Sequence, residues 1–291
     1  MAKVCVMRTD GTNCDNEAKY AFELAGAEAD IVHIKTLIKG CDPADADRRA
    51  RSLDQYDILC LPGGFSHGDY VSAGKIFATD MKHFLGEQIE KFVNYRKPII
   101  GICNGFQTLA KYGLLPKLDG KIKQTATLSY NESGNFECSP VELVKPKGGN
   151  EKCIWTKGIT RIRLPVAHGE GNFKADEELC DRLFNEGLVV FQYADLNGNP
   201  TMDFPDNPNG SMRGIAGICD PTGLIFGLMP HPERYNHPHN HHLASLLKVV
   251  GKDYVDMTDP YVRKIAEAHG GDVKVNSKPG IGSTFTINLP Y

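Results

Sequence analysis

The sequence has no long apolar run, no excess of one charge and no closely spaced cysteine pairs. No apolar stretch approaches the ~20 residues that span a bilayer, so we expect no transmembrane helix. Its 33 Lys+Arg and 36 Asp+Glu residues nearly balance. This balance argues against a basic nucleic-acid-binding protein and against an acidic disordered chain. The N-terminal residues also lack the apolar segment of a signal peptide, so we expect a cytoplasmic protein with neither nucleic acid nor membrane as a partner.

The nine cysteines are spread singly along the 291 residues, and their number is odd. This distribution fits reduced thiols and offers none of the paired spacings typical of zinc sites. Histidines are crowded only in the segment HPERYNHPHNHH, which contains His231, His237, His239, His241 and His242. Because two prolines break any helical register there, we predict a solvated loop leading into a helix at 243–250. We expect no native metal.

Short β-branched runs alternate with helical patterns over the first half of the chain. Strands are predicted at residues 4–7, 29–34, 56–61 and 98–102, with helices at 18–24, 75–95 and 105–111. This alternation predicts an α/β fold: an open, mostly parallel sheet flanked by helices, similar to flavodoxin. Later segments with apolar alternation at 136–143, 159–166 and 188–193, and a hairpin at 215–219 and 224–229, predict added antiparallel strands. We expect residues 1–250 to form one domain.

The segment PIIGICNGFQTLA carries the strongest chemical signal in the sequence. Gly101, Cys103 and Gly105 have the spacing of a strand–elbow–helix turn that presents a nucleophile. Flanking glycines let the backbone turn sharply, and the positive end of the following helix favours the reactive thiolate. Taken alone, this pattern is equally consistent with a small buried cysteine after a strand.

Two further motifs lie at the ends of predicted strands. His231 and Glu233 follow one strand in LMPHPER, and a cysteine nucleophile needs such a base with an orienting acceptor. Being two residues apart, both can face the same side of an extended segment. The glycines of PGGF follow another strand and can aim a backbone N–H at an oxyanion. Each motif alone could be an ordinary turn, but together they predict a nucleophile, a base pair and an oxyanion donor.

The motifs PGGF, GICNGFQ and PHPE resemble those of the class I (triad) glutamine amidotransferases. The segments GTNCDNE, PGGFSHGDY, VAHGEGNF and GLMPHPER are similar, more narrowly, to the glutaminase subunits of phosphoribosylformylglycinamidine synthases. The likeness runs in order over about residues 3–240. It implies hydrolysis of L-glutamine through a cysteinyl thioester, with the ammonia delivered for ATP-dependent conversion of formylglycinamide ribotide to its amidine in purine biosynthesis.

The resemblance assigns catalytic roles to three residues and an oxyanion hole to two more. Cys103 would attack the glutamine amide, His231 would take the thiol proton, and Glu233 would hold the imidazole in the required tautomer. The backbone N–H groups of Gly64 and Asn104 would form the oxyanion hole.

The resemblance also implies a substrate-holding role for residues near the elbow. Gln107 follows one helical turn after the nucleophile and would help to hold the amino-acid end of glutamine. His168 and Gly169, in the loop of VAHGEGNF, would do the same.

The implied partners are a synthetase subunit and a small accessory subunit of the same enzyme. ATP and magnesium would be used by the synthetase, and we expect no cofactor on this chain, since it lacks a G-x-x-x-x-G-K loop. Two alternatives remain open at this stage. The chain could be a class I amidotransferase that serves another synthetase, such as one for GMP, CTP or anthranilate. It could also be a non-enzymatic regulatory module.

Two features fall outside this interpretation. Cys14 follows the first strand, and with no histidine–acid pair left to serve it we predict a structural or partner-facing loop. Residues 251–291 are predicted to be a C-terminal extension of one helix and a hairpin. From residue 259 this extension resembles the end of a sensor histidine kinase ATP-binding domain. Because the rest of that domain is missing, we predict no kinase activity for it.

Overall fold

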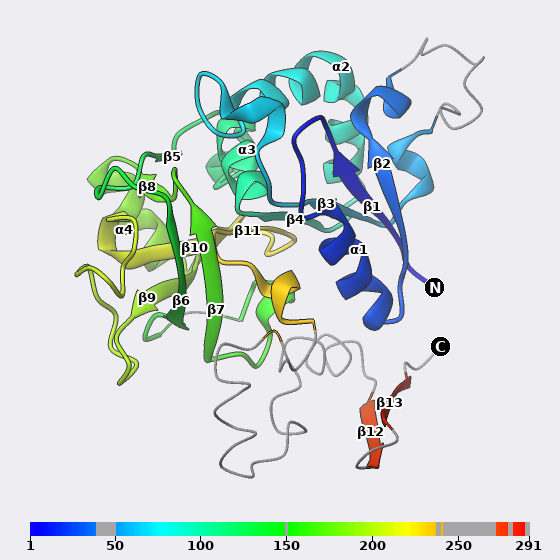
Figure 1. Ribbon diagram of the computed structural model, residues 1–291. Coiled ribbons are helices and arrows are strands. Elements are labelled where there is room, and N and C mark those ends of the chain that lie inside the picture. The colour runs from blue at the N-terminus through cyan, green and yellow to red at the C-terminus, as the bar shows by residue number, and fades with distance from the viewer. Residues whose placement is uncertain (39–50, 149–150, 237–239, 241–271, 279–281, 289–291) are drawn as a thin grey trace.

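The computed structural model describes residues 1–38, 51–148, 151–236, 240, 272–278 and 282–288, and its centre is a nine-stranded sheet (Figure 1). The strand order is β2-β1-β3-β4-β11-β10-β9-β6-β7. The sheet divides at β11 into a parallel part and an antiparallel part. The mostly parallel α/β architecture predicted from the sequence is therefore confirmed.

The parallel part consists of β2 (Glu28–His33), β1 (Lys3–Arg8), β3 (Ile58–Leu61), β4 (Ile99–Ile102) and β11 (Ile225–Leu228). Every residue of β4 and β11 is buried, which explains why both read as continuous apolar runs. β11 is the last of these strands in sequence, yet it pairs directly with β4, with Leu228 opposite Ile102. Segments that follow β4 and β11 therefore leave the sheet side by side.

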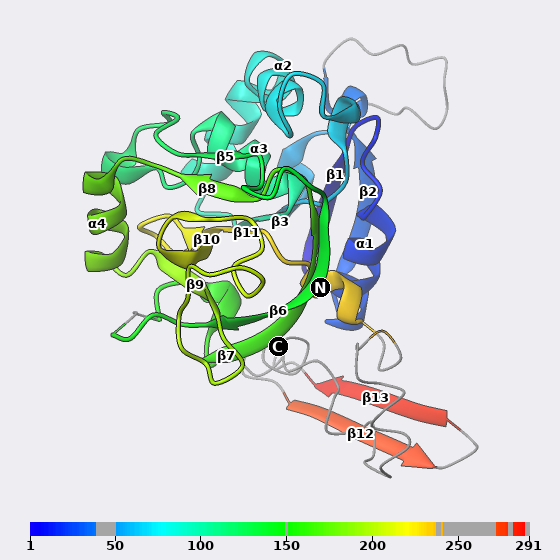
Figure 2. The same ribbon diagram turned by 60° about the vertical axis from the view of Figure 1, so that its left-hand side comes forward.

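The antiparallel part consists of β10 (Ile215–Cys219), β9 (Val189–Ala194), β6 (Glu137–Val144) and β7 (Arg161–His168). Strands β10 and β11 form the predicted hairpin. The long pair β6–β7 lies at one edge of the sheet and is strongly curved (Figure 2). A separate pair, β5 (Thr127–Ser129) and β8 (Asn172–Lys174), lies above this ribbon in the same view.

Four α-helices occur among the described residues: α1 (Asp15–Leu24), α2 (Lys75–Asn94), α3 (Asn104–Tyr112) and α4 (Glu177–Asn185). α2 and α3 cover one face of the parallel strands, and α1 lies on the other (Figure 1). α2 is one uninterrupted helix, as predicted, and Gly86 lies within it. α4, β5 and β8 were not predicted from the sequence.

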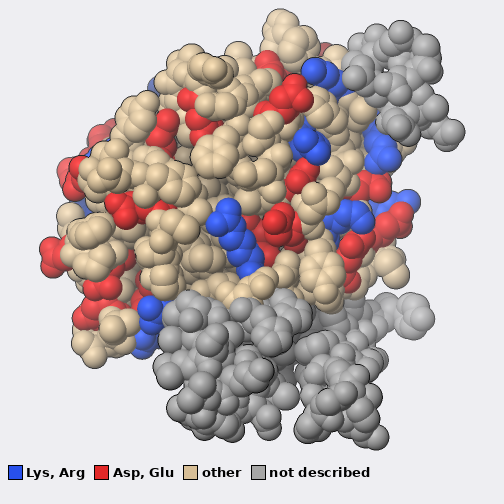
Figure 3. All heavy atoms as spheres, in the orientation of Figure 1, with Lys and Arg blue, Asp and Glu red and all other residues tan. Residues whose placement is uncertain are grey.

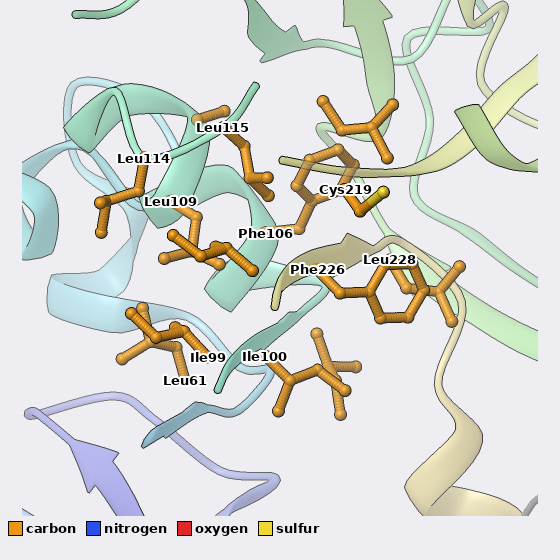
Figure 4. Packing of buried hydrophobic residues seen from close by; sticks show 14 of the residues in the cluster. Leu61, Ile99, Ile100, Phe106, Leu109, Leu114, Leu115, Cys219, Phe226 and Leu228 are labelled. Atoms are coloured by element: carbon orange, nitrogen blue, oxygen red, sulfur yellow. The ribbon is translucent and has the colours of Figure 1, made fainter. Parts of the chain in front are cut away.

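The core lies between the parallel strands and α3. Buried side chains of β3, β4, β10, β11 and α3 gather around this part of the sheet (Figure 4). Phe106 of α3 is fully buried against this sheet, and a methyl group on Gly227 would lie only 2.1 Å from its ring. Such close packing fixes α3 over the ends of β4 and β11, which is where the predicted nucleophile and base are found.

The described part of the C-terminal extension is a hairpin, β12 (Asp272–Lys278) and β13 (Gly282–Asn288). Val273 pairs with Ile287, and Val275 with Phe285, so the hairpin predicted in this extension is present. The helix predicted at 243–250, the helix predicted in the C-terminal extension and most of the histidine run lie outside the described residues. No helix in the described ranges is long and apolar enough to cross a membrane. On the face shown in Figure 3, acidic and basic side chains are interspersed.

Candidate functional site

The predicted site residues converge at the carboxyl ends of the parallel strands. Cys103 follows β4, Gly63 and Gly64 follow β3, and His231 follows β11. The end of β7 joins them, because the N–H of His231 donates a hydrogen bond of 2.8 Å to the carbonyl of Pro165. This edge is where open α/β sheets bind their ligands.

Cys103 occupies a strained elbow between β4 and α3. Its backbone has φ 51° and ψ −107°, a region that non-glycine residues rarely adopt, at a cost of about 1–3 kcal/mol. The backbone N–H of Cys103 donates to the carbonyl of Leu228, 2.8 Å away, so β11 holds the elbow in place. The side chain is buried, and its sulfur lies 3.8 Å from the carbonyl oxygen of Ala167.

The glycines flanking Cys103 act differently from the prediction. Neither Gly101 nor Gly105 has a positive φ, so the sharp turn falls on the cysteine itself. A methyl group on Gly105 would lie 1.9 Å from the carbonyl oxygen of Leu61, and one on Gly101 would lie 2.6 Å from the backbone of Gly105. These glycines are therefore needed because α3 packs directly on the backbones of β3 and β4.

His231 and Glu233 form a buried pair. Nδ1 of His231 lies 2.6 Å from Oε1 of Glu233, and the two residues are 1% and 3% exposed. The contact is as predicted, but the local conformation is not. Instead of continuing as an extended segment, the chain enters a 3-10 turn at Pro232–Tyr235 directly after His231. Proline at the first position favours this turn and brings the carboxylate back to the ring.

The surroundings of His231 favour its charged form. Burial alone lowers the pKa of His231, but the Glu233 carboxylate and the thiols of Cys103 and Cys14 outweigh it and raise the pKa well above its usual value. The ring can therefore hold a proton taken from a neighbouring thiol, which a base in this position must do.

Gly63 lies close to both the ring and the cysteine. A methyl group on Gly63 would lie 2.7 Å from Cε1 of His231 and 3.4 Å from Cβ of Cys103. The next residue, Gly64, has φ 138° and is held by a bridge to Thr12. A Cβ atom on Gly64 would lie 2.6 Å from the backbone nitrogen of Asn13. The PGGF loop therefore closes over both reacting groups and tolerates no side chain there.

Asn104 and Gln107 connect α3 to the loop after β7. Asn104 is the first residue of α3, where backbone N–H groups have no partner within the helix. Its Nδ2 donates to Oε1 of Gln107 over 3.0 Å, and Nε2 of Gln107 donates to the carbonyl of Glu170 over 2.5 Å. Both side chains are buried. The predicted substrate-holding segments thus lie in contact with each other.

His168 is buried at the end of β7, and both of its ring nitrogens have neighbours. Nδ1 lies 3.1 Å from Oδ1 of Asn131, and Nε2 lies 3.4 Å from Nδ2 of Asn209. Burial, with a smaller contribution from the nearby His231, lowers the pKa of His168 to about 3. Asn131 also accepts from the N–H of Gly171 and donates to the carbonyl of His168. The ring is neutral and helps to shape the loop that contains Gly169.

A buried charged network that the sequence did not reveal supports the same loop. Oε2 of Glu170 accepts hydrogen bonds from the hydroxyl of Ser72 and the N–H of Ala73, and lies 3.9 Å from Nζ of Lys111. Oδ1 of Asp69 accepts from Nδ2 of Asn104. Burial and the Glu170 carboxylate raise the pKa of Asp69 to about 6. Asp69 is part of the PGGFSHGDY motif, but the sequence alone does not show which groups its carboxylate contacts.

Cys14 lies beside the histidine–acid pair, a position that the sequence did not predict, and its burial fits the structural alternative given for its loop. Its side chain is 3% exposed, which excludes a partner-facing position. Its sulfur, one ring nitrogen of His231 and one carboxylate oxygen of Glu233 lie within 4.8 Å of one another. The N–H of Cys14 also donates to the carbonyl of Gly63, 3.2 Å away. Sequence separation hid this neighbour, because the loop after β1 meets the segment after β11 only in the folded sheet.

Comparison with known proteins agrees with this geometry. Residues 1–254 match the family described as the CobB/CobQ-like glutamine amidotransferase domain. The phosphoribosylformylglycinamidine synthase subunit PurQ of Methanococcus maripaludis is 44% identical over 235 residues, covering 80% of this chain and 82% of that protein. The subunit of the same name from Archaeoglobus fulgidus is 44% identical over 242 residues, covering 80% and 87%.

A solved structure is also similar. One chain of the PurLQS structure from Thermotoga maritima matches with a TM-score of 0.63 and 30% identity. The match covers 91% of this chain and 97% of that one. The arrangement of sheet and helices described above is therefore shared with that chain.

Proposed function

The chain belongs to the glutamine amidotransferases, and from that premise we propose that it is the glutaminase subunit of a phosphoribosylformylglycinamidine synthase. The observation that carries the proposal is the meeting of Cys103 with the His231–Glu233 pair across Gly63. Three strand ends far apart in sequence supply a nucleophile, a base and an orienting carboxylate in one buried place. That set performs acyl transfer on an amide.

The first half of the reaction releases ammonia. The sulfur of Cys103 attacks the side-chain amide carbon of glutamine while its proton passes to His231. The carbonyl oxygen becomes an oxyanion that the backbone N–H groups of Gly64 and Asn104 stabilise. When the carbon–nitrogen bond breaks, the imidazolium gives its proton to the leaving nitrogen, and a thioester remains on Cys103.

The second half restores the cysteine. His231 takes a proton from water, the resulting hydroxide attacks the thioester carbon, and glutamate leaves as the sulfur regains its proton. Glu233 stays ionised throughout and stabilises the charged ring over the 2.6 Å contact with Nδ1. Burial of both residues keeps this interaction strong.

Substrate holding falls to residues around α3 and the end of β7. We assign Gln107, with the loop that contains His168 and Gly169, to the amino-acid end of glutamine. The buried ring of His168 acts by fixing the loop through Asn131, since its nitrogens face two asparagine amides.

We further propose that the ammonia passes to a synthetase subunit, with a small accessory subunit completing the enzyme. ATP and magnesium belong to the synthetase, and this chain carries no cofactor of its own. The cysteine nucleophile must stay reduced to act, so we place the enzyme in the cytoplasm.

The decisive experiment measures glutamine hydrolysis with and without the synthetase subunit. We expect Cys103→Ala to abolish ammonia release while its circular dichroism spectrum stays unchanged. Cys138→Ala is the matched control, because Cys138 is an exposed thiol on β6. Full glutaminase activity in Cys103→Ala would refute the assignment of the nucleophile.

Reconstitution separates this proposal from an amidotransferase of another pathway. With the purine synthetase subunit, ATP and formylglycinamide ribotide, glutamine-dependent amidine formation should appear. Glutamine hydrolysis without amidine formation would point to another synthetase partner. Absence of hydrolysis under every condition would favour a non-enzymatic module.

A further inference from the structure

We propose that Cys14, His231 and Glu233 form a zinc site whose occupation switches off the glutaminase. The inhibitory part of this inference rests on the proposed function, whereas the metal site stands on geometry alone. It shares His231 and Glu233 with the segment HPERYNHPHNHH but uses none of the later histidines of that segment, and its sulfur comes from Cys14 in the loop after β1.

The three side chains already point to a common place. Their ligand atoms lie within 4.8 Å of one another, and all three residues are buried. Around a tetrahedral Zn²⁺, with bonds of about 2.0–2.3 Å, ligand atoms stand roughly 3.3–3.7 Å apart. Small side-chain movements, including the opening of the 2.6 Å contact between Nδ1 of His231 and Oε1 of Glu233, therefore bring Cys14, His231 and Glu233 into ligand positions.

An unpartnered polar atom marks the site as incomplete. Oε2 of Glu233 is buried and has no hydrogen-bond partner among the described residues. Burying a carboxylate oxygen without a partner is unfavourable, and a bound cation would offset part of that cost.

The environment of Cys14 suits a metal-bound thiolate. Nη2 of Arg234 donates to its sulfur over 3.4 Å, a contact that a thiolate ligand can keep. The thiol itself donates to Oδ1 of Asn13 over 3.5 Å, and that proton would leave to solvent when the metal binds. One sulfur, one nitrogen and one oxygen ligand favour Zn²⁺ over Mg²⁺ or Ca²⁺, which prefer oxygen alone.

Occupation of this site removes the base from the reaction. A His231 ring that coordinates a metal and has lost its Glu233 contact cannot take the proton of Cys103. Zinc should therefore inhibit glutamine hydrolysis, and a chelator should restore it.

Cobalt titration of the full-length Cys103→Ala protein tests the site without relying on activity. Co²⁺ takes zinc sites and gives an intense ultraviolet band only when a thiolate is bound. We expect that band at one equivalent of Co²⁺, and its displacement by Zn²⁺. Cys14→Ser, made in the same background, should lose the band, whereas Cys138→Ser should keep it. The histidines at 237–242 cannot mimic the signal, because they offer no sulfur.

Either of two results would overturn the site: no thiolate band in the Cys103→Ala protein, or a band that survives Cys14→Ser. The first needs no variant of Cys14, so a folding defect in Cys14→Ser cannot rescue the proposal. A zinc-insensitive glutaminase would overturn the inhibitory part. If the metal-free wild-type protein hydrolyses no glutamine even with the synthetase subunit present, the proposed function fails, but the cobalt spectra still decide the site.

Discussion

At the scale of single residues, the proposed activity depends on the buried imidazole of His231 and the buried carboxylate of Glu233, which contact each other. Oε1 of Glu233 contacts Nδ1 of His231, which leaves Nε2 of the ring to take the thiol proton. The Glu233 carboxylate has no other hydrogen-bond partner among the described residues. The carboxylate can therefore serve only the histidine. A change in its charge should affect catalysis far more than folding.

We predict that Glu233→Gln lowers the turnover number for glutamine by about 10³–10⁴-fold. The amide keeps the shape but neither fixes the correct tautomer nor stabilises the imidazolium. Steady-state ammonia release measures the effect. Glu177→Gln, on the surface of α4 and 70% exposed at its side chain, is the control. Equal rates for the two variants would contradict the role given to Glu233.

A second residue-scale prediction concerns pH. Burial lowers the pKa of His168 to about 3, below its value in the unfolded chain. Between these values the unfolded state binds more protons, so His168 contributes stability above about pH 6.5 that is lost as the pH falls toward 3. In NMR spectra the His168 ring should show no titration between about pH 5 and 8. Comparison with His168→Gln identifies its signal, and a midpoint inside that range would refute the prediction.

At the scale of elements, the PGGF loop fits against the site without room for any side chain. Gly63 is the closest point, because a methyl group there would overlap Cε1 of His231, which is buried and cannot move aside. Gly86 is the opposite case. It lies inside α2, and a methyl group on it would meet nothing within 4 Å.

These two glycines form a matched pair of substitutions. Gly63→Ala should lower glutaminase activity by about 10²-fold, since it displaces the base. Gly86→Ala should leave activity unchanged and raise the free energy of unfolding by about 1 kcal/mol, because alanine is the better helix former. Activity assays and urea unfolding measure both. Normal activity in Gly63→Ala would show that the loop moves away from the ring in solution.

The sequence was informative where local pattern and chemistry coincide. The apolar runs of β4 and β11 predicted buried parallel strands, and the spacing around Cys103 predicted the elbow. α4 could have been found from Asp176, whose side chain accepts from the N–H of Leu179 at the helix start. By contrast, the strands β5 and β8 have only three residues each, too few to show the alternation of apolar and polar side chains that predicts a strand.

Tertiary neighbours could not be predicted in this way. Cys14 belongs to the loop after β1, and nothing local places it beside His231. The network of Glu170, Lys111 and Asp69 likewise joins three segments whose proximity depends on how α3 packs. The 3-10 turn after His231 is an intermediate case, since the proline was visible but its effect on Glu233 was not.

At the scale of the whole molecule, we propose residues 1–250 as the amidotransferase domain and 251–291 as an accessory extension. The family match ends at residue 254. The described part of the extension is a single hairpin, which is too small to fold alone. Although this segment resembles part of a kinase domain, we therefore predict that it neither binds nor hydrolyses ATP.

Deletion of residues 259–291 should leave glutamine-dependent amidine formation within about twofold of the full-length rate, since no proposed site residue lies there. Reconstituted synthesis and size-exclusion chromatography with the synthetase subunit measure the outcome. Loss of partner association with retained glutaminase activity would make the extension a docking element. A fall in both would instead show that it supports the fold.

The pairing of β11 with β4 has a consequence for how the protein is made. Cys103 leaves the ribosome long before His231, and its base exists only once the last parallel strand has inserted beside the strand that carries it. A nascent or half-folded chain thus carries a thiol with no proton acceptor in place. Reactivity arrives together with completion of the sheet, so incomplete copies cannot waste glutamine.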